Sequence, residues 1–256
     1  MRAKFCTLII LLLLAAFPVQ AGDTLFQYST IDALMAGLYD GGLSVAELKK
    51  RGNFGLGTFN DLDGEMVVLD GQVYQVKSDG KVHLAGDALK TPFAAVTVFT
   101  PELSQVINKA GSLKELTELL DKALPSSNLF YAVKIQGRFP QMTVRSVPRQ
   151  VRPYPPLPRA VEKQTVFPLK EVEGTLVGLR CPAYARNINV PGYHFHFLTQ
   201  DRTQGGHVLD CALENLTAQI DVIHGFSMIL PKDQEFYQVD LSGEKGKELE
   251  KVEKRK

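Results

Sequence analysis

Cysteine is scarce in this sequence, with three residues among 256, and a scaffold held together by many disulfides is therefore excluded. Cys6 lies in an N-terminal segment that is expected to be removed, so Cys181 and Cys211 are the two left in the mature chain. One disulfide or two free thiols are both compatible with this pair. Stability must then come from a packed core, with or without a metal.

The sequence also lacks an excess of charge of either sign. It carries 29 basic and 28 acidic residues, and no extended basic patch, internal repeat or nucleotide-binding glycine motif is present. Nucleic acid is therefore not an expected partner. The hydrophobic content of 45% is that of an ordinary globular protein, and the length allows one large or two small cores.

No apolar run is long enough for a membrane span. The longest, from Leu8 to Phe17, is followed by Pro18 and ends well short of the roughly 20 residues that a spanning helix needs. Arg2 and Lys4 precede this run, and small residues around Ala21 supply a cleavage site. We therefore predict a signal peptide over residues 1–21, export after cleavage near Ala21, and no membrane association of the mature protein.

The next part of the chain, residues 22–150, is expected to be an α+β half. Three Asp-Gly pairs, which begin at Asp63, Asp70 and Asp79, are strong hairpin signals between short apolar or alternating runs. Ser44 with Glu47 and Ser112 with Glu115 have the spacing of helix capping boxes. We predict a mixed or antiparallel sheet with a few helices packed on it.

A proline-rich segment divides the sequence. Five prolines fall between Pro148 and Pro158, where neither a central strand nor a continuous helix can form, so we predict a linker over residues 151–160. Residues 161–242 are predicted to be a mainly antiparallel β half, and residues 243–256 a charged tail or terminal helix. The strands expected there cover residues 171–180, 192–198, 206–213, 219–224 and 227–230.

Three of the five histidines fall within fourteen residues, at His194, His196 and His207. In a strand, His194 and His196 project from one face while their aromatic neighbours project from the other. A turn at residues 200–205 can bring His207 beside them. Cys211 is expected on the same strand face as His207. It lies two residue pairs further along the strand, however, which is too far for both side chains to bind the same ion.

Three imidazoles with an open fourth position are typical of catalytic zinc, so Zn²⁺ is the expected cofactor. Spacing alone leaves alternatives open. The three rings could satisfy buried hydrogen bonds, or serve a zinc hydrolase, a cupin-like oxygenase or a secreted metal-binding module without turnover.

Three segments together resemble the alpha-acetolactate decarboxylase family. They are residues 57–66 (GTFNDLDGEM), 193–198 (YHFHFL) and 201–210 (DRTQGGHVLD), and the similarity spans nearly the whole mature chain. The resemblance implies zinc on His194, His196 and His207, and conversion of 2-acetolactate to acetoin and carbon dioxide without thiamine. It implies further roles for four residues: Glu65, Arg145 and Glu253 in catalysis, and Thr58 in substrate binding.

The residues by themselves support these four roles only partly. Glu65 shares a strand face with apolar residues, so it is either a strand-end carboxylate in water or a charge held in an apolar wall. Arg145 is also compatible with an exposed strand face. Glu253 lies in a charge-rich tail, where Glu250 is one turn away. We expect the zinc site where the two halves meet, because its ligands come from the second half and Glu65 and Arg145 from the first. A homodimer is compatible with exposed edge strands.

Overall fold

The computed structural model describes residues 23–253, so the predicted signal peptide at residues 1–21 and the last three residues of the charged tail lie outside the described part. Strands predominate and the helices are few and short, which agrees with the expected sheets and sparse helices. Within residues 23–253, no helix has both the length and the apolar character needed to cross a membrane.

A seven-stranded sheet has the order β14-β1-β8-β3-β4-β5-β6. It is mixed, because β1 pairs in parallel with β14 and the other neighbours are antiparallel. The Asp70-Gly71 turn between β4 and β5 has positive φ at both residues, as the hairpin signal predicted. The strands are β1 (Thr24–Tyr28), β3 (Phe54–Thr58), β4 (Glu65–Leu69), β5 (Gln72–Val76), β6 (Val82–Leu84), β8 (Ala94–Thr97) and β14 (Gly225–Ile229).

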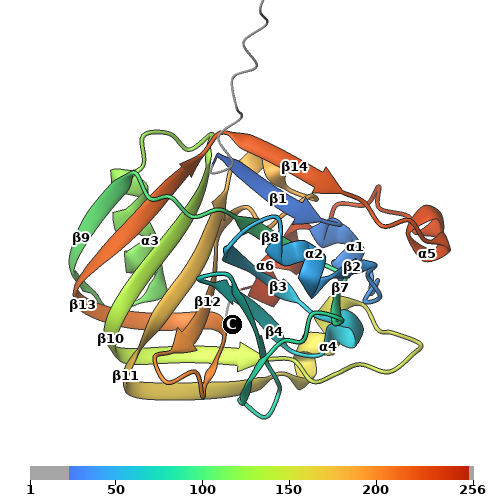
Figure 1. Cartoon of the computed structure of the whole chain (residues 1–256), viewed down its shortest axis with the longest axis horizontal. Coiled ribbons are helices and arrows are strands. Elements are labelled where there is room, and N and C mark those ends of the chain that lie inside the picture. The colour runs from blue at the N-terminus through green and yellow to red at the C-terminus, as the bar shows by residue number, and fades with distance from the viewer. Residues whose placement is uncertain (1–22, 254–256) are drawn as a thin grey trace, which may run out of the picture.

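A second, five-stranded antiparallel sheet has the order β10-β11-β12-β13-β9. It closes on itself, because β10 also pairs with β13. Its long strands curve together on one side of the molecule, and the seven-stranded sheet lies on the other (Figure 1). The strands are β9 (Leu103–Ala110), β10 (Phe130–Ser146), β11 (Thr165–Cys181), β12 (Gly192–Thr199) and β13 (Gly205–Ile223).

The two sheets do not follow the two predicted halves of the sequence. Strands β9 and β10 precede the proline-rich segment but pair with β11 and β13, which follow it, while β14 returns to the seven-stranded sheet beside β1. The two strands expected at 206–213 and 219–224 are one strand, β13. The proline-rich segment is itself packed, since the Tyr39 hydroxyl donates to the Pro155 carbonyl at 2.9 Å.

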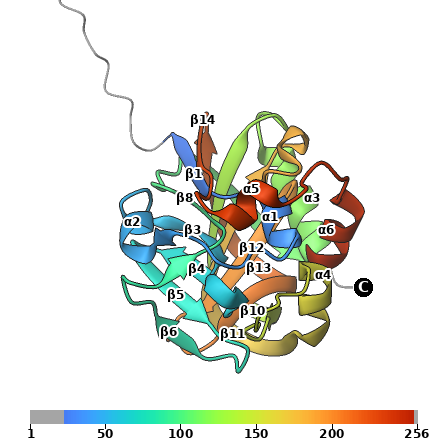
Figure 2. The ribbon, with the colours of Figure 1, turned by 90° about the vertical axis from the view of Figure 1, so that its right-hand side faces the viewer.

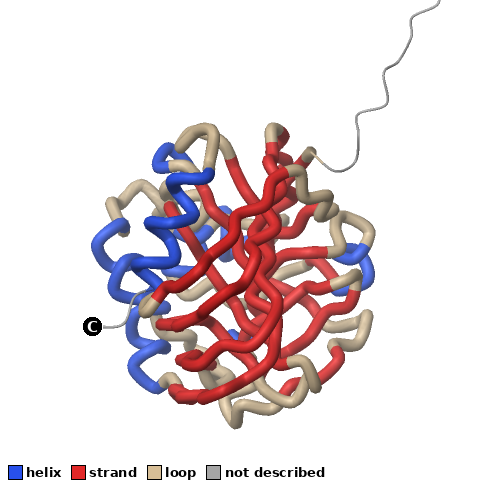
Figure 3. The backbone as a smooth tube through the Cα atoms, turned by 90° about the vertical axis from the view of Figure 1, so that its left-hand side faces the viewer, coloured by secondary structure: helices blue, strands red, loops and turns tan. Residues whose placement is uncertain are grey.

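Four of the helices, α1, α2, α3 and α5, begin at a residue whose side chain caps the first turn. Ser44 and Glu47 form the predicted capping box of α2, and the Ser112 hydroxyl accepts from the Glu115 amide at the start of α3. Most helical turns gather along one side of the molecule (Figures 2 and 3). The helices are α1 (Ile31–Met35), α2 (Val45–Lys49), α3 (Leu113–Ala123), α4 (Leu157–Ala160), α5 (Gln234–Gln238) and α6 (Gly246–Glu253); short strands β2 (Leu43–Ser44) and β7 (Lys90–Thr91) pair beside them.

Four apolar clusters hold these layers together. One fills the closed sheet beneath α3, the second lies between the two sheets, and the third covers the other face of the seven-stranded sheet. The fourth joins α1, α4 and α6, with Leu34, Leu157 and Leu249 among its members. The C-terminal helix is thereby fixed against the N-terminal one, and the site described next lies beside this fourth cluster.

Candidate metal and active site

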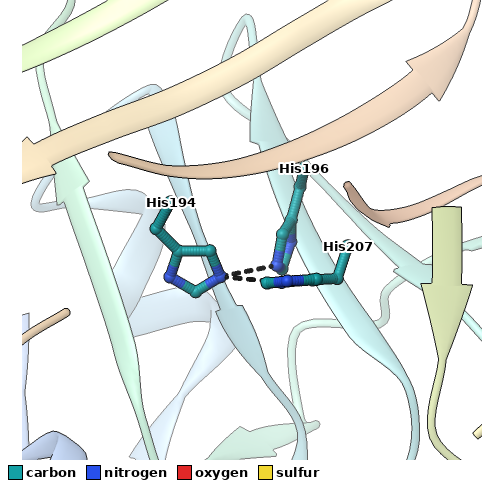
Figure 4. Close-up of side chains that lie close together, drawn as sticks. All are labelled: His194, His196 and His207. Carbon is teal, nitrogen blue, oxygen red and sulfur yellow. Dashed lines mark hydrogen bonds between the residues drawn. The ribbon is translucent and has the colours of Figure 1, made fainter. Parts of the chain in front are cut away.

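His194 and His196 lie on β12 as the alternation predicts. Both imidazoles are buried on one face, while Phe195 and Phe197 enter the core of the closed sheet on the other. The next strand completes the set, because His207 of β13 is the direct register partner of His196. Residues directly opposite in an antiparallel pair have Cβ atoms about 4.5–5.5 Å apart. The three rings therefore converge on one point (Figure 4).

The ring nitrogens that meet there are His194 Nε2, His196 Nε2 and His207 Nδ1. His194 Nε2 lies 3.2 Å from His196 Nε2 and 3.0 Å from His207 Nδ1. Burial lowers the pKa of His194 to about 3, and it lowers the pKa of the other two well below the usual value. All three rings are therefore neutral at ordinary pH, and neutral imidazole is the form that binds metals.

Two of the rings are held in the tautomer that leaves the converging nitrogen free. The Nδ1–H of His196 donates to the Met66 carbonyl at 2.7 Å, and the Nε2–H of His207 donates to the Glu253 carbonyl at 3.3 Å. Such outer hydrogen bonds are the usual support of metal-binding histidines. Among the described residues these three are the group that could hold an ion, and three neutral nitrogens with an open side fit zinc.

Cys211 is not a fourth ligand, although the reason differs from the one expected. The β10–β13 ladder shifts register between Thr143 and Val144, opposite the stretch from Val208 to Asp210. A bulge of this kind reverses side-chain parity. Cys211 therefore enters the apolar core of the closed sheet, on the opposite face from His207. Cys181 and Cys211 are both buried free thiols, and burial raises the pKa of each to about 12.

Glu65 and Arg145 form a buried ion pair beside the histidines. Arg145 Nη1 donates to Glu65 Oε1 at 2.8 Å, and both side chains are at most 10% exposed. Glu65 Oε2 also lies 3.7 Å from His196 Nε2. Burial raises the pKa of Glu65 to about 7; Arg145 opposes this rise and Glu253 adds to it. Glu65 is therefore a carboxylate held inside the protein and not a strand end in water.

The last helix brings Glu253 to the same place. Its Oε2 lies 3.6 Å from His194 Nε2 and 3.7 Å from His207 Nε2, and it has no hydrogen-bond partner among residues 23–253. Burial raises the pKa of Glu253 to about 7, and Arg145 opposes the rise. Glu250, the glutamate one helical turn earlier in the tail, is exposed. Leu249 and Val252 anchor the helix in the fourth apolar cluster.

Thr58 completes the predicted set. It pairs with Glu65 across β3 and β4, and its hydroxyl donates to the Gly64 carbonyl at 2.7 Å. Glycine is required at position 64, because φ is +89° and a Cβ would lie 2.3 Å from the Val76 carbonyl oxygen. All seven predicted site residues line one pocket: Thr58, Glu65, Arg145, His194, His196, His207 and Glu253.

The pocket also has an apolar wall that the sequence did not reveal. Its members are Ile31, Leu34, Leu62, Phe93, Val147 and Leu157, all from the fourth apolar cluster. A buried leucine beside a site has the same sequence pattern as one in a core, so no local signal could have found them. The pocket is therefore lined by both polar and apolar side chains, which suits a small molecule that carries both oxygens and alkyl groups.

Comparison with known proteins gives consistent matches over most of the chain. A family model for alpha-acetolactate decarboxylase matches residues 25–243. An alpha-acetolactate decarboxylase of Methanosarcina mazei is 50% identical over 91% of this chain and 81% of its own length. That of Methylococcus capsulatus is 46% identical over 89% of this chain and 88% of its own.

Solved structures also match this fold over most of the chain. A crystal structure of alpha-acetolactate decarboxylase from Bacillus subtilis strain 168 superposes with a TM-score of 0.88 at 38% identity, covering 91% of this chain and all of the other. A Staphylococcus aureus protein of unknown function, described as similar to alpha-acetolactate decarboxylase, gives 0.85 at 29% identity and covers 90% of this chain and 99% of the other.

Proposed function

The chain belongs to the alpha-acetolactate decarboxylase family, and from this premise we propose that it is a zinc-dependent enzyme that converts 2-acetolactate to acetoin and carbon dioxide. The observation that supports the metal is the convergence of three neutral imidazole nitrogens, two of them with the tautomer set by a carbonyl. His194, His196 and His207 would hold the ion, at the junction between the two sheets. Zinc bound there would supply a Lewis acid for the negative charge that develops on the ketone oxygen of the substrate.

Arg145 is suited to binding the substrate carboxylate. Its Nη1 is engaged by Glu65, but its Nε is buried and has no partner among the described residues. A guanidinium stays charged at any ordinary pH and offers donors in a fixed plane, so we assign it to orientation and not to proton transfer. Because Arg145 lines the pocket, its positive charge favours an anionic ligand there.

When the C–C bond to the carboxylate breaks, its electron pair stays on the carbon that carried the carboxylate. The adjacent ketone delocalises this pair onto its oxygen, which gives an enediolate. One proton must then reach the former carboxyl-bearing carbon to give acetoin. Glu65 and Glu253 line the pocket on either side of the histidines, so we assign proton delivery to this pair. Thr58 lies opposite Glu65, where its hydroxyl oxygen can still accept a hydrogen bond from the substrate.

The experiment that tests this function supplies acetolactate to the zinc-loaded protein and measures acetoin. Release well above the spontaneous rate supports the proposal, and release at the spontaneous rate contradicts it. Metal analysis of the purified protein tests the zinc: iron together with oxygen-dependent activity would favour a cupin-like oxygenase instead.

We further propose that the chain is exported and that it forms a homodimer. The signal-like segment at residues 1–21 supports export, and a mature N-terminus near Gly22, read by mass spectrometry, is the expected result.

The seven-stranded sheet ends in β14 and β6, and edge strands of this kind are where a second copy can pair. Light scattering of the purified protein measures the mass.

A further inference from the structure

Leu62 has an unusual backbone conformation for a residue in the apolar wall of the pocket. Its φ is +54°, the left-handed region that glycine adopts freely and a leucine side chain disfavours. Among the six apolar wall residues, it alone has a positive φ. Its side chain is nevertheless buried, at 4% exposed. Strain at a residue that faces a binding pocket suggests that the side chain has a purpose there.

The segment that carries Leu62 connects two other residues of the pocket. Residues 59–64 join β3 to β4, so the segment begins after Thr58 and ends before Glu65, which are register partners. The Thr58 hydroxyl closes this loop by its bond to the Gly64 carbonyl. Leu62 therefore lies within three or four residues of two polar groups of the site.

Residues before Leu62 are held from outside the pocket. The side chain of Asn60 accepts from the Gly41 amide at 2.9 Å and donates to the Gly41 carbonyl at 3.1 Å. The Asp61 carboxylate accepts from Arg149 and from the Tyr154 hydroxyl, and its carbonyl accepts from the amide of Gln150 at 2.7 Å.

The residue after Leu62 is held in the same way. The Asp63 carbonyl accepts from the Gln75 side chain at 2.6 Å, and the Asp63 carboxylate lies 3.0 Å from Lys77 Nζ. Each polar neighbour of Leu62 is thus tied to a different part of the fold. The loop is consequently fixed on both sides, and Leu62 is the side chain that it presents to the pocket.

We propose that Leu62 is the specificity-determining residue that limits the size of the alkyl groups on the substrate. This inference rests on the proposed function. Acetolactate carries one methyl group on the carbinol carbon and one on the ketone, and the polar groups of the pocket leave the apolar wall to receive them. Because the loop is fixed, Leu62 cannot retreat from a longer alkyl group, and an ethyl group in place of a methyl meets its side chain.

The test uses the zinc-loaded protein with three substrates: acetolactate, the homologue with ethyl on the carbinol carbon, and the homologue with ethyl on the ketone. Leu62→Ala removes most of the side chain, and Leu62→Gly does so while relieving the positive φ, so at least the second variant should fold. One methylene in an apolar pocket changes kcat/KM by roughly 10- to 200-fold. We expect the ethyl-to-methyl ratio of kcat/KM to rise at least about tenfold for one homologue.

Leu69→Ala is the matched control, because Leu69 is a buried leucine at the far end of β4, outside the pocket. It should lower stability and leave the ratio unchanged. If both Leu62 variants lose activity on all three substrates equally, as a structural role would predict, the inference is wrong. If the wild-type protein does not convert acetolactate, the proposed function is wrong and the inference fails with it. If it does convert acetolactate but the Leu62 variants leave the ethyl-to-methyl ratio unchanged, the inference alone is wrong.

Discussion

Arg145 lies directly opposite His207 across the antiparallel ladder of β10 and β13. His207 is in turn opposite His196 on β12, so the three residues form a row across three neighbouring strands. The charge of Arg145 adds to burial in lowering the pKa of both imidazoles. The cation that we assign to the substrate carboxylate thus also helps burial to keep neutral the rings that we propose as metal ligands.

Removal of Arg145 should destabilise the protein because Glu65 would remain buried without its partner. Breaking a buried ion pair from one side costs about 3–5 kcal/mol. Arg145→Gln should therefore lower the free energy of unfolding by about that amount at pH 8, and the double variant with Glu65→Gln should recover part of it. Urea denaturation measures both. Arg138→Gln, which breaks the exposed pair with Glu171, is the control and should cost no more than about 1 kcal/mol. Equal effects of Arg145→Gln and Arg138→Gln would refute this account of the pair.

His207→Ala should lose both zinc and activity. The substitution removes one of the three converging nitrogens, and a site with two imidazoles holds the ion far more weakly. Metal analysis after gel filtration, together with acetoin release, measures the two losses. His83→Ala is the control, since His83 is exposed on β6 and should leave zinc content and rate unchanged. Full zinc occupancy in His207→Ala would remove it from the ligand set.

The side chain of Glu253 should matter for turnover and not for zinc retention. Its carboxylate lies 3.6 Å or more from the histidine nitrogens, so it is not needed to complete the ligand set. Glu253→Gln should keep zinc and lower kcat by about 100-fold, the lower end of what a proton-transferring group contributes. A chain that ends after Val252 also lacks the Glu253 carbonyl that accepts from His207, so it should lose turnover and bind zinc more weakly as well. The control is Glu250→Gln on the exposed side of α6. Unchanged kcat in both Glu253 variants would contradict the assignment.

The sequence predicted the histidine cluster because its geometry is local. Strand alternation places His194 and His196 on one face whatever the rest of the fold does, and a short turn suffices to bring His207 beside them. Glu65 and Arg145 are different: they are 80 residues apart, and their contact depends on how two sheets pack. Only the resemblance to a family could assign them.

Other features of the fold depend on long-range register and were not predicted. The parallel pairing of β14 with β1 joins segments about 200 residues apart, and no turn signal records it. The bulge opposite Val144 reversed the parity of Cys211 without any mark in the sequence. The apolar wall resembles ordinary core. Local chemistry was therefore more predictable than the topology that surrounds it.

Because of the buried Asp221 carboxyl, the free energy of unfolding should fall as the pH rises from about 4 to 6. This carboxyl is buried; its Oδ2 accepts from the Thr100 amide at 3.2 Å, and its Oδ1 has no partner among the described residues. Burial raises its pKa to about 6 from an ordinary value of 3.8. Between these pH values the folded state binds more protons than the unfolded state, so the free energy of unfolding falls as the pH rises. Above pH 6 the destabilisation by the buried charge is complete.

Asp221→Asn removes this penalty while an amide oxygen can still accept from Thr100. A shift of about 2 pKa units corresponds to at most about 3 kcal/mol, so the variant should be about 1–3 kcal/mol more stable than wild type at pH 7.5 and no more stable at pH 4. Urea denaturation at the two pH values measures the difference. Glu214→Gln, on the exposed part of the same strand, should show no such dependence. An Asp221→Asn variant whose advantage is the same at both pH values would show that the buried charge does not destabilise the fold.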